Sequence, residues 1–215
     1  MSRGLFITLE GIEGAGKSTV ARWIRDWLAA RGLRATLTRE PGGTALAERV
    51  RQIALERGQE RLTAVTETLL MFAARGIHLE NLIRPALERG EWVVCDRFTD
   101  ATRAYQGGGR GVDPQLIESL ASQVQGGLEP DCTLLLDLPV PVGLERARSR
   151  AGAVDRFEAE AQAFFERVRA AYLALARREP RRLHVIDAAA PLEAVETQVA
   201  GVLEQLPRGG AGGAP

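Results

Sequence analysis

The sequence has little lysine, little cysteine and no net charge. Lys17 is its only lysine, so almost all of the 28 basic side chains are arginines. Acidic side chains also number 28, which leaves no net basic field to attract nucleic acid. The two cysteines, Cys95 and Cys132, lie in apolar runs. We expect them to be small buried hydrophobes, which argues against a disulfide or a cysteine metal site.

Long apolar runs are also missing from the sequence. A membrane-spanning helix needs about 20 consecutive apolar residues, and the longest runs here have the length of a strand. No signal-peptide pattern is present, so we expect a soluble, cytoplasmic protein with no membrane partner. The apolar content of 45% suits one compact domain. We expect this domain to span residues 1–207, and the low-complexity segment 208–215 to be a disordered tail.

Strand-like and helix-like segments alternate along the chain. Short runs that are apolar on both faces predict buried strands at residues 5–10, 34–38, 92–95, 132–138 and 183–186. Helical spacing predicts helices at residues 18–31, 44–57, 63–89, 114–125, 140–150, 157–178 and 191–205. Pro85 should kink or split the third of these helices. The alternation predicts a doubly wound, three-layer α/β sandwich with a parallel sheet.

Residues 11–19 carry the most specific motif in the chain. The sequence Gly-Ile-Glu-Gly-Ala-Gly-Lys-Ser-Thr fits the phosphate-binding P-loop pattern G-x-x-x-x-G-K-[ST], between a predicted strand and a predicted helix. The glycines let backbone N–H groups point at phosphate oxygens, and the helix N-terminus favours negative charge. We expect Lys17 to reach the β- and γ-phosphates and Ser18 to ligate Mg²⁺. The G-x-G-x-x-G dinucleotide pattern is not met.

Charged residues follow several predicted strands directly. In open α/β sheets, ligands bind beyond the carboxyl ends of the strands. We expect Asp96 to help hold Mg²⁺ and Arg97 to clamp a second phosphate, with Asp137 as an alternative metal partner. Arg39 and Glu40 begin a Pro-Gly-Gly turn and are equally compatible with a solvated loop.

Three other segments each allow a ligand-binding or a plain structural interpretation. Phe72 and Arg75 could stack on a base and read its edge, although their spacing alone favours a core aromatic and a solvated arginine. Residues 104–111 form a loop with four glycines, which indicates mobility, close ligand approach or a long connection. The four arginines between residues 146 and 156 suit a lid closing on ATP, at about residues 147–157, or an ordinary charged helix.

Together these segments resemble the thymidylate kinase family of P-loop kinases, from Phe6 to about Ala188. The matching motifs are residues 10–18, 38–44, 96–98, 104–107 and 155–158. The resemblance implies a P-loop NTPase fold with a five-stranded parallel sheet, and a homodimer whose interface we expect at residues 63–89. It also implies that ATP, with Mg²⁺, phosphorylates dTMP to dTDP. The expected ATP-binding residues are Gly11, Ile12, Glu13, Gly14, Ala15, Gly16, Lys17, Ser18 and Thr19.

The resemblance further implies how the phosphate and sugar of dTMP are held. Glu13 resembles the acid that accepts the sugar 3′-hydroxyl. Arg39 and Arg97 resemble the clamps on the dTMP phosphate, with Glu40 nearby and Arg51 as a further arginine of the site.

The base and the deoxyribose have their own expected contacts. Arg75 resembles the reader of thymine O4, and Thr102 and Gln106 match positions that touch the thymine edge. Tyr105 backs the deoxyribose, where a bulky side chain would crowd a 2′-hydroxyl. The residue that covers the base is either Met71, at the position of the family's phenylalanine, or Phe72, one residue later.

The remaining expectations concern phosphoryl transfer. The P-loop has no arginine after its acid, which resembles the bacterial type in which lid arginines supply the transition-state cation. Arg150 and Arg156 are the expected lid residues, and Lys17 and Arg97 complete the catalytic set. Two rival functions stay open: another nucleotide or deoxynucleoside kinase, and a nucleotide-dependent switch. The switch is disfavoured because the guanine-specifying pattern Asn-Lys-x-Asp is missing.

Overall fold

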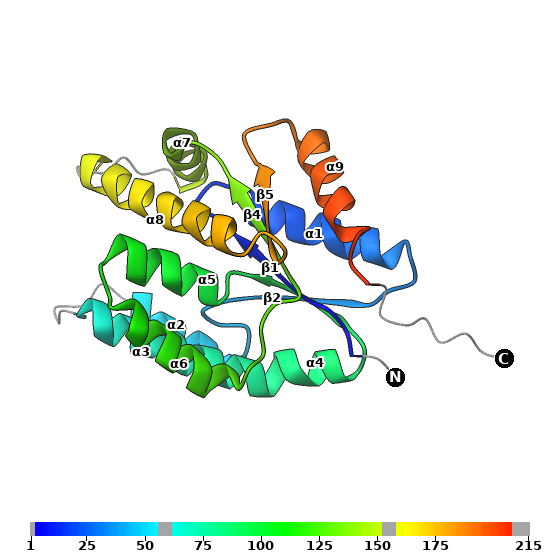
Figure 1. The fold of residues 1–215 in the computed structure, drawn as a ribbon, viewed down its shortest axis with the longest axis horizontal. Coiled ribbons are helices and arrows are strands. Elements are labelled where there is room, and N and C mark those ends of the chain that lie inside the picture. The colour runs from blue at the N-terminus through cyan, green and yellow to red at the C-terminus, as the bar shows by residue number, and fades with distance from the viewer. Residues whose placement is uncertain (1–2, 56–61, 152–157, 208–215) are drawn as a thin grey trace.

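The computed structural model describes residues 3–55, 62–151 and 158–207 of the chain. A five-stranded sheet lies at the centre, with strand order β2-β3-β1-β4-β5 and every neighbouring pair parallel. The strands are β1 (Phe6–Glu10), β2 (Ala35–Arg39), β3 (Trp92–Asp96), β4 (Cys132–Asp137) and β5 (Leu183–Asp187). The predicted parallel sheet of the P-loop NTPase fold is confirmed (Figure 1).

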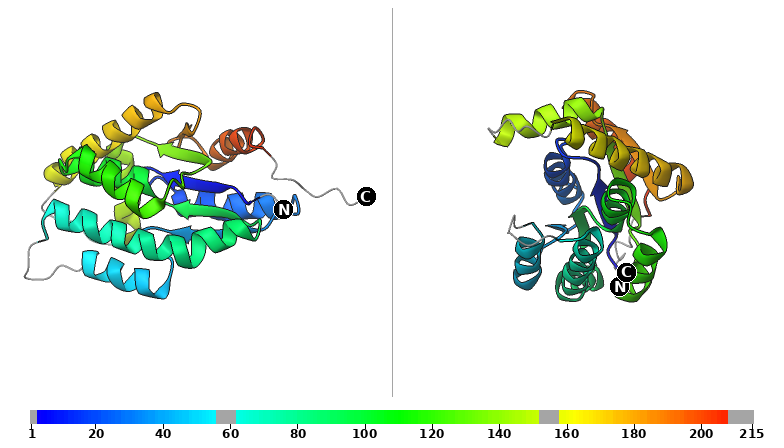
Figure 2. Two further views of the ribbon diagram at one scale, coloured as in Figure 1. Left: turned by 60° about the horizontal axis from the view of Figure 1, so that its bottom comes forward. Right: turned by 90° about the vertical axis from the view of Figure 1, so that its left-hand side faces the viewer.

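Helices cover both faces of this sheet (Figures 1 and 2). They are α1 (Lys17–Ala29), α2 (Ala45–Leu55), α3 (Ala64–His78), η1 (Leu79–Ile83), α4 (Arg84–Glu88), α5 (Thr99–Thr102), η2 (Arg103–Gly109), α6 (Pro114–Gln125), α7 (Val140–Ala151), α8 (Glu158–Arg178) and α9 (Leu192–Leu203). Ile7 and Leu9 of β1 share a core cluster with α1 and α9, whereas Phe6 packs in the cluster of η1 and α4. In the described part of the chain, no helix has the length and apolar character needed to cross a membrane.

The predicted helix at residues 63–89 is interrupted, as expected from Pro85. The chain passes from α3 through the π-helical turn η1 into α4, where Pro85 lies in the first turn. Proline has no N–H to donate, and its ring crowds the carbonyl one turn earlier. A wider π turn ahead of the proline accommodates this local defect without ending the helical run.

The glycine-rich segment 104–111 is mostly helical, so the predicted loop is wrong. Helix α5 continues directly into the π-helix η2, which ends at Gly109. Helix α8 packs on these turns so closely that a Cβ on Gly108 would lie 2.5 Å from the Cβ of Ala171. A Cβ on Gly109 would lie 2.5 Å from Cε2 of Phe164. These glycines therefore provide room for a neighbouring helix, which a local sequence pattern does not reveal.

Gly108→Ala is expected to destabilise the protein by about 1–3 kcal/mol, because the added methyl group overpacks the contact with Ala171. Denaturant unfolding measures the difference. The matched control is Gly201→Ala in α9, where an added Cβ meets no heavy atom within 4 Å. The control should stabilise the helix by about 0.5–1 kcal/mol. If Gly108→Ala is stabilised like the control, η2 and α8 are not tightly packed.

Both cysteines are free thiols buried in central strands, as expected. Burial raises the pKa of the Cys132 thiol to about 12. A thiol held so far from ionisation is a poor nucleophile and a poor metal ligand, so each cysteine acts as a small core side chain.

The register of the sheet brings its chemically active residues to one edge. Leu9 of β1 and Arg39 of β2 both pair with Asp96 of β3. Because all five strands are parallel, their carboxyl ends and the loops that follow lie at this edge. The P-loop, between β1 and α1, lies there as well.

Candidate active site

The P-loop turns through glycines whose backbone angles suit few other residues. Gly11, Gly14 and Gly16 have φ values of 133°, 79° and 89°. Gly16 precedes α1 in the left-handed conformation and provides no side-chain cap. The first N–H groups of α1 are therefore available to a bound anion, at the positive end of the helix dipole.

Lys17 is buried inside the turn of the P-loop. Its Nζ donates to the carbonyl oxygens of Gly11, at 3.2 Å, and Ile12, at 3.1 Å. It also lies 4.0 Å from Oδ1 of Asp96. Burial first, and then the charge of Arg97, lower the pKa of Lys17 to about 8. The ammonium is thus only marginally favoured without a ligand, and a triphosphate would supply the missing negative charge.

We expect the binding of a nucleoside triphosphate above about pH 8 to be accompanied by proton uptake at Lys17. The pKa of the free protein is about 8, and negative charge on the ligand raises it in the complex. Affinity should therefore be flat below about pH 7 and should fall with rising pH above 8, by up to about tenfold per unit. Titration calorimetry in two buffers of different ionisation enthalpy counts the proton. Lys17→Ala, the control, should show no uptake, and a wild-type protein without uptake would contradict the assignment.

Ser18 and Asp96 line a common cavity beside the P-loop. Oδ1 of Asp96 is buried and accepts no hydrogen bond from the part of the chain that the structure describes. A hydroxyl and a carboxylate are the oxygen donors that Mg²⁺ prefers, and this ion commonly takes only one or two protein ligands beside phosphates and water. The donor set therefore fits Mg²⁺, although the described residues contain no cluster of three or more His, Cys, Asp or Glu side chains.

Asp137, the alternative metal partner, is engaged elsewhere. Its two carboxylate oxygens accept hydrogen bonds of 2.7 and 2.8 Å from Nε and Nη2 of Arg169. A carboxylate in such a bidentate pair is a weaker candidate for a metal ligand than one with an unpaired oxygen. The geometry therefore favours Asp96.

A second cavity adjoins the P-loop and collects most of the residues expected to bind the acceptor. It is lined by Glu40, Pro41, Met71, Arg75, Arg97, Phe98, Ala101, Thr102, Tyr105 and Gln106. These residues come from the carboxyl ends of β2 and β3 and from α3, α5 and η2. Segments that are far apart in the sequence thus build one chamber.

Arg75 lies at the wall of this cavity and is fully buried. Its Nε donates to Oε2 of Glu40, at 2.7 Å, and its Nη2 donates to Oγ1 of Thr102, at 3.0 Å. Glu40 is also held by Nδ1 of His78, at 3.1 Å. The remaining nitrogen, Nη1 of Arg75, is buried and has no hydrogen-bond partner among the described residues. A buried unpaired donor is costly, so an arginine of this kind beside a cavity is a candidate to bind an acceptor atom of a ligand.

Arg97 ties the second cavity to Glu13 of the P-loop. Nη2 of Arg97 donates to Oε1 of Glu13, at 3.0 Å, and the Tyr105 hydroxyl donates to Oε2 of Glu13, at 2.8 Å. The Arg97 guanidinium also lies over the Tyr105 ring, 4.4 Å from its centroid. The backbone of Arg97 has a φ of 74°, an uncommon value for a residue with a side chain. This strain at the junction is typical of a functional position.

Of the two candidates to cover the base, Met71 lines the cavity and Phe72 does not. Phe72 is 2% exposed and packs with Val112 and Ile117 in a core cluster. One residue along a helix turns the side chain by about 100°, which separates the two positions. The Arg75 guanidinium lies 4.6 Å from the centroid of the Phe72 ring, so Phe72 supports the arginine from behind.

Two of the predicted arginines lie outside the second cavity. Both carboxylate oxygens of Glu48 lie 3.0 Å from Nη2 of Arg39, which lines the neighbouring cavity together with Ser18 and Asp96. Nη1 of Arg51 donates to the carbonyl oxygen of Pro41, at 2.9 Å, and so supports the cavity wall. Burial, followed by the charge of Arg39, lowers the pKa of Arg51.

The expected lid is only partly described. Arg150 lies near the end of α7. Residues 152–157, which include Arg156, lie outside the described residues. The expected tail at residues 208–215 lies outside them as well.

Sequence reasoning missed three residues of the cavity wall, Pro41, Phe98 and Ala101. Pro41 and Phe98 each stand within two residues of a strand end that was already singled out, so reading further along these loops would have found them.

The parallel sheet, the P-loop and the adjoining acceptor cavity define a kinase of the P-loop NTPase fold. The comparisons with known proteins narrow this class. The family model described as "Thymidylate kinase" matches residues 9–199. The chain is 56% identical to "Thymidylate kinase" of Alkalilimnicola ehrlichii over 197 residues, which cover 92% of this chain and 91% of the relative. It is 60% identical to "Thymidylate kinase" of Pseudomonas putida strain GB-1 over 204 residues, 93% of this chain and 95% of the relative.

A solved structure agrees with these sequence relatives. The crystal structure of thymidylate kinase from Ehrlichia chaffeensis superimposes with a TM-score of 0.77 at 33% identity, covering 94% of this chain and 99% of that chain. The chain belongs to the thymidylate kinase family.

Proposed function

We propose that this protein transfers the γ-phosphoryl group of ATP to dTMP, giving ADP and dTDP for dTTP synthesis in the cytoplasm. The observation that carries the proposal is Arg75, which lines the acceptor cavity and whose buried Nη1 has no hydrogen-bond partner among the described residues. A pyrimidine carbonyl such as thymine O4 would satisfy this donor. The names of the relatives support the same substrate.

In this proposal the base enters the acceptor cavity in a defined orientation. Arg75 donates to thymine O4, and Met71 covers the ring with its polarisable thioether. Thr102 and Gln106 lie along the base edge; Gln106 is held by a 2.7 Å hydrogen bond from its Nε2 to Oε1 of Glu67. Tyr105 lies where the sugar would pass and disfavours a 2′-hydroxyl.

The sugar and phosphate then extend toward the P-loop. Glu13 accepts the 3′-hydroxyl, in exchange for part of its present bonding to Arg97 and Tyr105. Arg97 is released to grip the dTMP phosphate, with Arg39 approaching from the neighbouring cavity. Arginine suits this role because its planar fork can pair with two phosphate oxygens.

Catalysis is alignment combined with charge neutralisation. The acceptor oxygen belongs to a phosphate that is largely ionised at neutral pH, so no strong general base is required. Gly11 to Thr19 hold the triphosphate, with the Lys17 ammonium at its β- and γ-groups. Ser18 and Asp96 would hold Mg²⁺, which neutralises charge on the same groups when bound. We further propose that residues 147–157 form a lid on the single domain 1–207, and that Arg150 and Arg156 add cations.

The test is ADP formation from ATP and Mg²⁺, coupled to NADH oxidation, across a panel of nucleoside monophosphates. We expect strong dependence on dTMP, weaker dependence on dUMP and none on AMP, GMP or CMP. Activity with a different monophosphate would keep the kinase chemistry and overturn the assignment of the base contacts. Absence of any acceptor-dependent ADP would favour a nucleotide-dependent switch.

We also propose a homodimer that forms through α2, α3 and Leu62, which precedes α3. Large apolar side chains are exposed there, namely Leu46, Ile53, Leu55, Leu62, Val65 and Leu69. Six exposed apolar side chains on two packed helices and the residues before them are typical of an interaction site. Light scattering after size exclusion should give twice the chain mass of 23.3 kDa. Leu69→Glu should shift this value toward one chain, whereas Leu192→Glu, exposed on α9, should not.

A further inference from the structure

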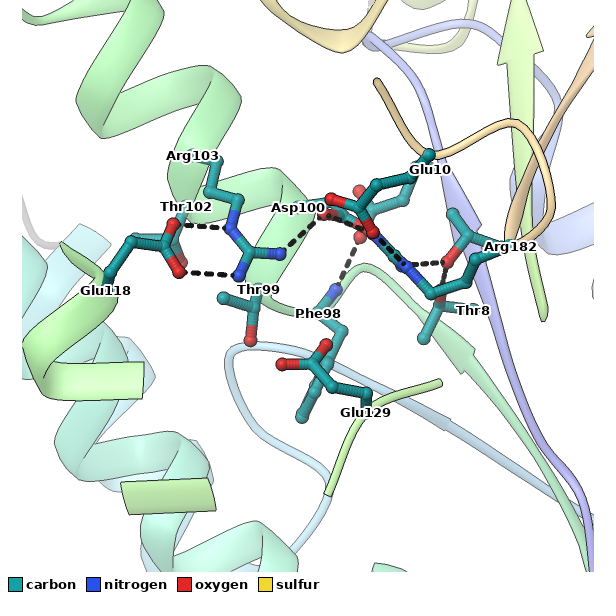
Figure 3. A network of polar contacts seen from close by, with 12 residues as sticks. Thr8, Glu10, Phe98, Thr99, Asp100, Thr102, Arg103, Glu118, Glu129 and Arg182 are labelled. Carbon is teal, nitrogen blue, oxygen red and sulfur yellow. Dashed lines mark hydrogen bonds and ion pairs between the residues drawn. The ribbon is translucent and has the colours of Figure 1, made fainter. Parts of the chain in front are cut away.

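Glu10 is a buried carboxyl group at the end of β1 that the proposed reaction does not use. It has no exposed surface. Its Oε1 accepts a 2.8 Å hydrogen bond from the backbone N–H of Phe98, and its Oε2 lies 2.6 Å from the hydroxyl of Tyr172 in α8. Figure 3 shows the carboxyl group of Glu10 directed at the Phe98 backbone. A carboxyl group buried this deeply is retained only where its hydrogen bonds have a purpose.

The two peptide groups that flank Arg97 are both tied to β1. The N–H of Arg97 donates to the carbonyl oxygen of Leu9, at 2.9 Å. The next N–H, that of Phe98, donates to Glu10. Between these two anchors, Arg97 holds its φ of 74°. A left-handed backbone costs a residue with a Cβ about 1–2 kcal/mol, so it persists only where neighbouring bonds impose it.

The imposed backbone determines where the Arg97 side chain points. Its guanidinium reaches Glu13 and lies over the Tyr105 ring. Tyr172, the second partner of Glu10, supports the surroundings of the Arg97 side chain. Its ring packs edge-on against the Tyr105 ring, with 6.3 Å between centroids. Glu10 therefore acts on both the backbone and the surroundings of Arg97.

A network of charged side chains lies beside Glu10. Asp100 is buried and held by Nη1 of Arg103, at 2.9 Å, and by Nη1 of Arg182, at 2.7 Å (Figure 3). Burial first, and then the charge of Asp100, raise the pKa of Glu10 to about 8. Both hydrogen bonds survive protonation of Oε2, because the Tyr172 hydroxyl then accepts instead of donating. The structure around Arg97 therefore depends more on the two hydrogen bonds of Glu10 than on its charge.

We propose that Glu10 is a positioning residue for the dTMP phosphate, acting through the backbone of Arg97. This inference rests on the proposed function, in which Arg97 grips that phosphate. It predicts a larger effect on the acceptor than on ATP, because Phe98 and Tyr172, the two hydrogen-bond partners of Glu10, are not among the expected ATP-binding residues.

The test compares Glu10→Ala, Glu10→Gln and the control Thr8→Val in steady-state kinetics. We expect Glu10→Ala to raise the KM for dTMP tenfold or more, with the KM for ATP changed less than twofold. Glu10→Gln keeps an acceptor for Phe98 and a partner for Tyr172, and should stay within about threefold of wild type. Thr8 lies on the same strand as Glu10, and Thr8→Val loses a buried 2.7 Å hydrogen bond to Thr133 of β4. This control should lower Tm without moving either KM.

Two outcomes overturn the inference: equal changes in both KM values, or a Glu10→Gln variant as impaired as Glu10→Ala. If Glu10→Ala does not fold, Tyr172→Phe decides, because it removes one hydrogen bond and keeps the ring. It should raise the KM for dTMP about threefold, and an unchanged KM would count against the inference. Failure of the proposed function itself looks different, since wild-type protein would then show no dTMP-dependent ADP formation.

Discussion

Replacing Lys17 with alanine is expected to lower kcat for ADP formation by about three orders of magnitude and to leave the fold intact. Removing one preorganised charge from a transferring group typically costs a factor of 10²–10³, and here the charge is a buried ammonium. The fold should survive because Lys17 bonds only to the carbonyls of its own loop, apart from a distant contact with Asp96. Coupled kinetics and circular dichroism measure the two effects.

The control for Lys17→Ala is Arg25→Ala in the same helix. Arg25 is exposed and pairs with its neighbour Asp26, so its loss removes a cation from α1 without touching the loop. Turnover of the control should match wild type. A Lys17→Ala protein with normal turnover and a normal spectrum would remove Lys17 from the catalytic set.

The second large effect is expected at Arg97, where alanine and glycine should be equally damaging to activity but unequal in stability. Either change removes the guanidinium, and kcat/KM for dTMP should fall by about two to three orders of magnitude. Alanine must still adopt a φ of 74°, whereas glycine does so freely. We therefore expect Arg97→Gly to be more stable than Arg97→Ala by about 0.5–1 kcal/mol in denaturant unfolding.

The same pair of substitutions at Arg25 provides the matched comparison for Arg97. Arg25 lies inside α1 with an ordinary helical backbone, so alanine should there be the more stable by about 1 kcal/mol. Opposite orders at the two positions would isolate the backbone strain at Arg97. The same order at both would show that the left-handed conformation carries no cost.

Local patterns were sufficient for much of the fold and for the triphosphate side of the site. The P-loop is nine consecutive residues, and buried parallel strands are apolar on both faces, so both could be predicted without tertiary information. Asp96 follows its strand directly, and the rule that ligands bind beyond carboxyl strand ends was enough to find it. The choice of Asp96 over Asp137 as the metal ligand required the structure, because Arg169 pairs with Asp137 from a helix that is 32 residues away in sequence.

The acceptor side depended more on long-range packing. Tyr105 meets Glu13 across 92 residues, and Tyr172 meets Glu10 across 162. No spacing rule encodes such pairs. The glycines of η2 were misread for the same reason, since only the approach of α8 explains them. Met71 and Phe72 could not be separated in the sequence, because the packing of the helix decides which of the two side chains faces the cavity.

The isolation of Lys17 gives the protein an unusual chemical selectivity. It is the one side-chain amine in the sequence, and its lowered pKa of about 8 leaves more of it as free amine at neutral pH than in a solvated lysine. Apart from the α-amino group, an acylating reagent therefore has a single amine to modify, and that amine lies within the P-loop. The extent of acylation at this amine therefore measures the fraction of protein whose phosphate site is free. A bound nucleotide should protect Lys17 from the reagent.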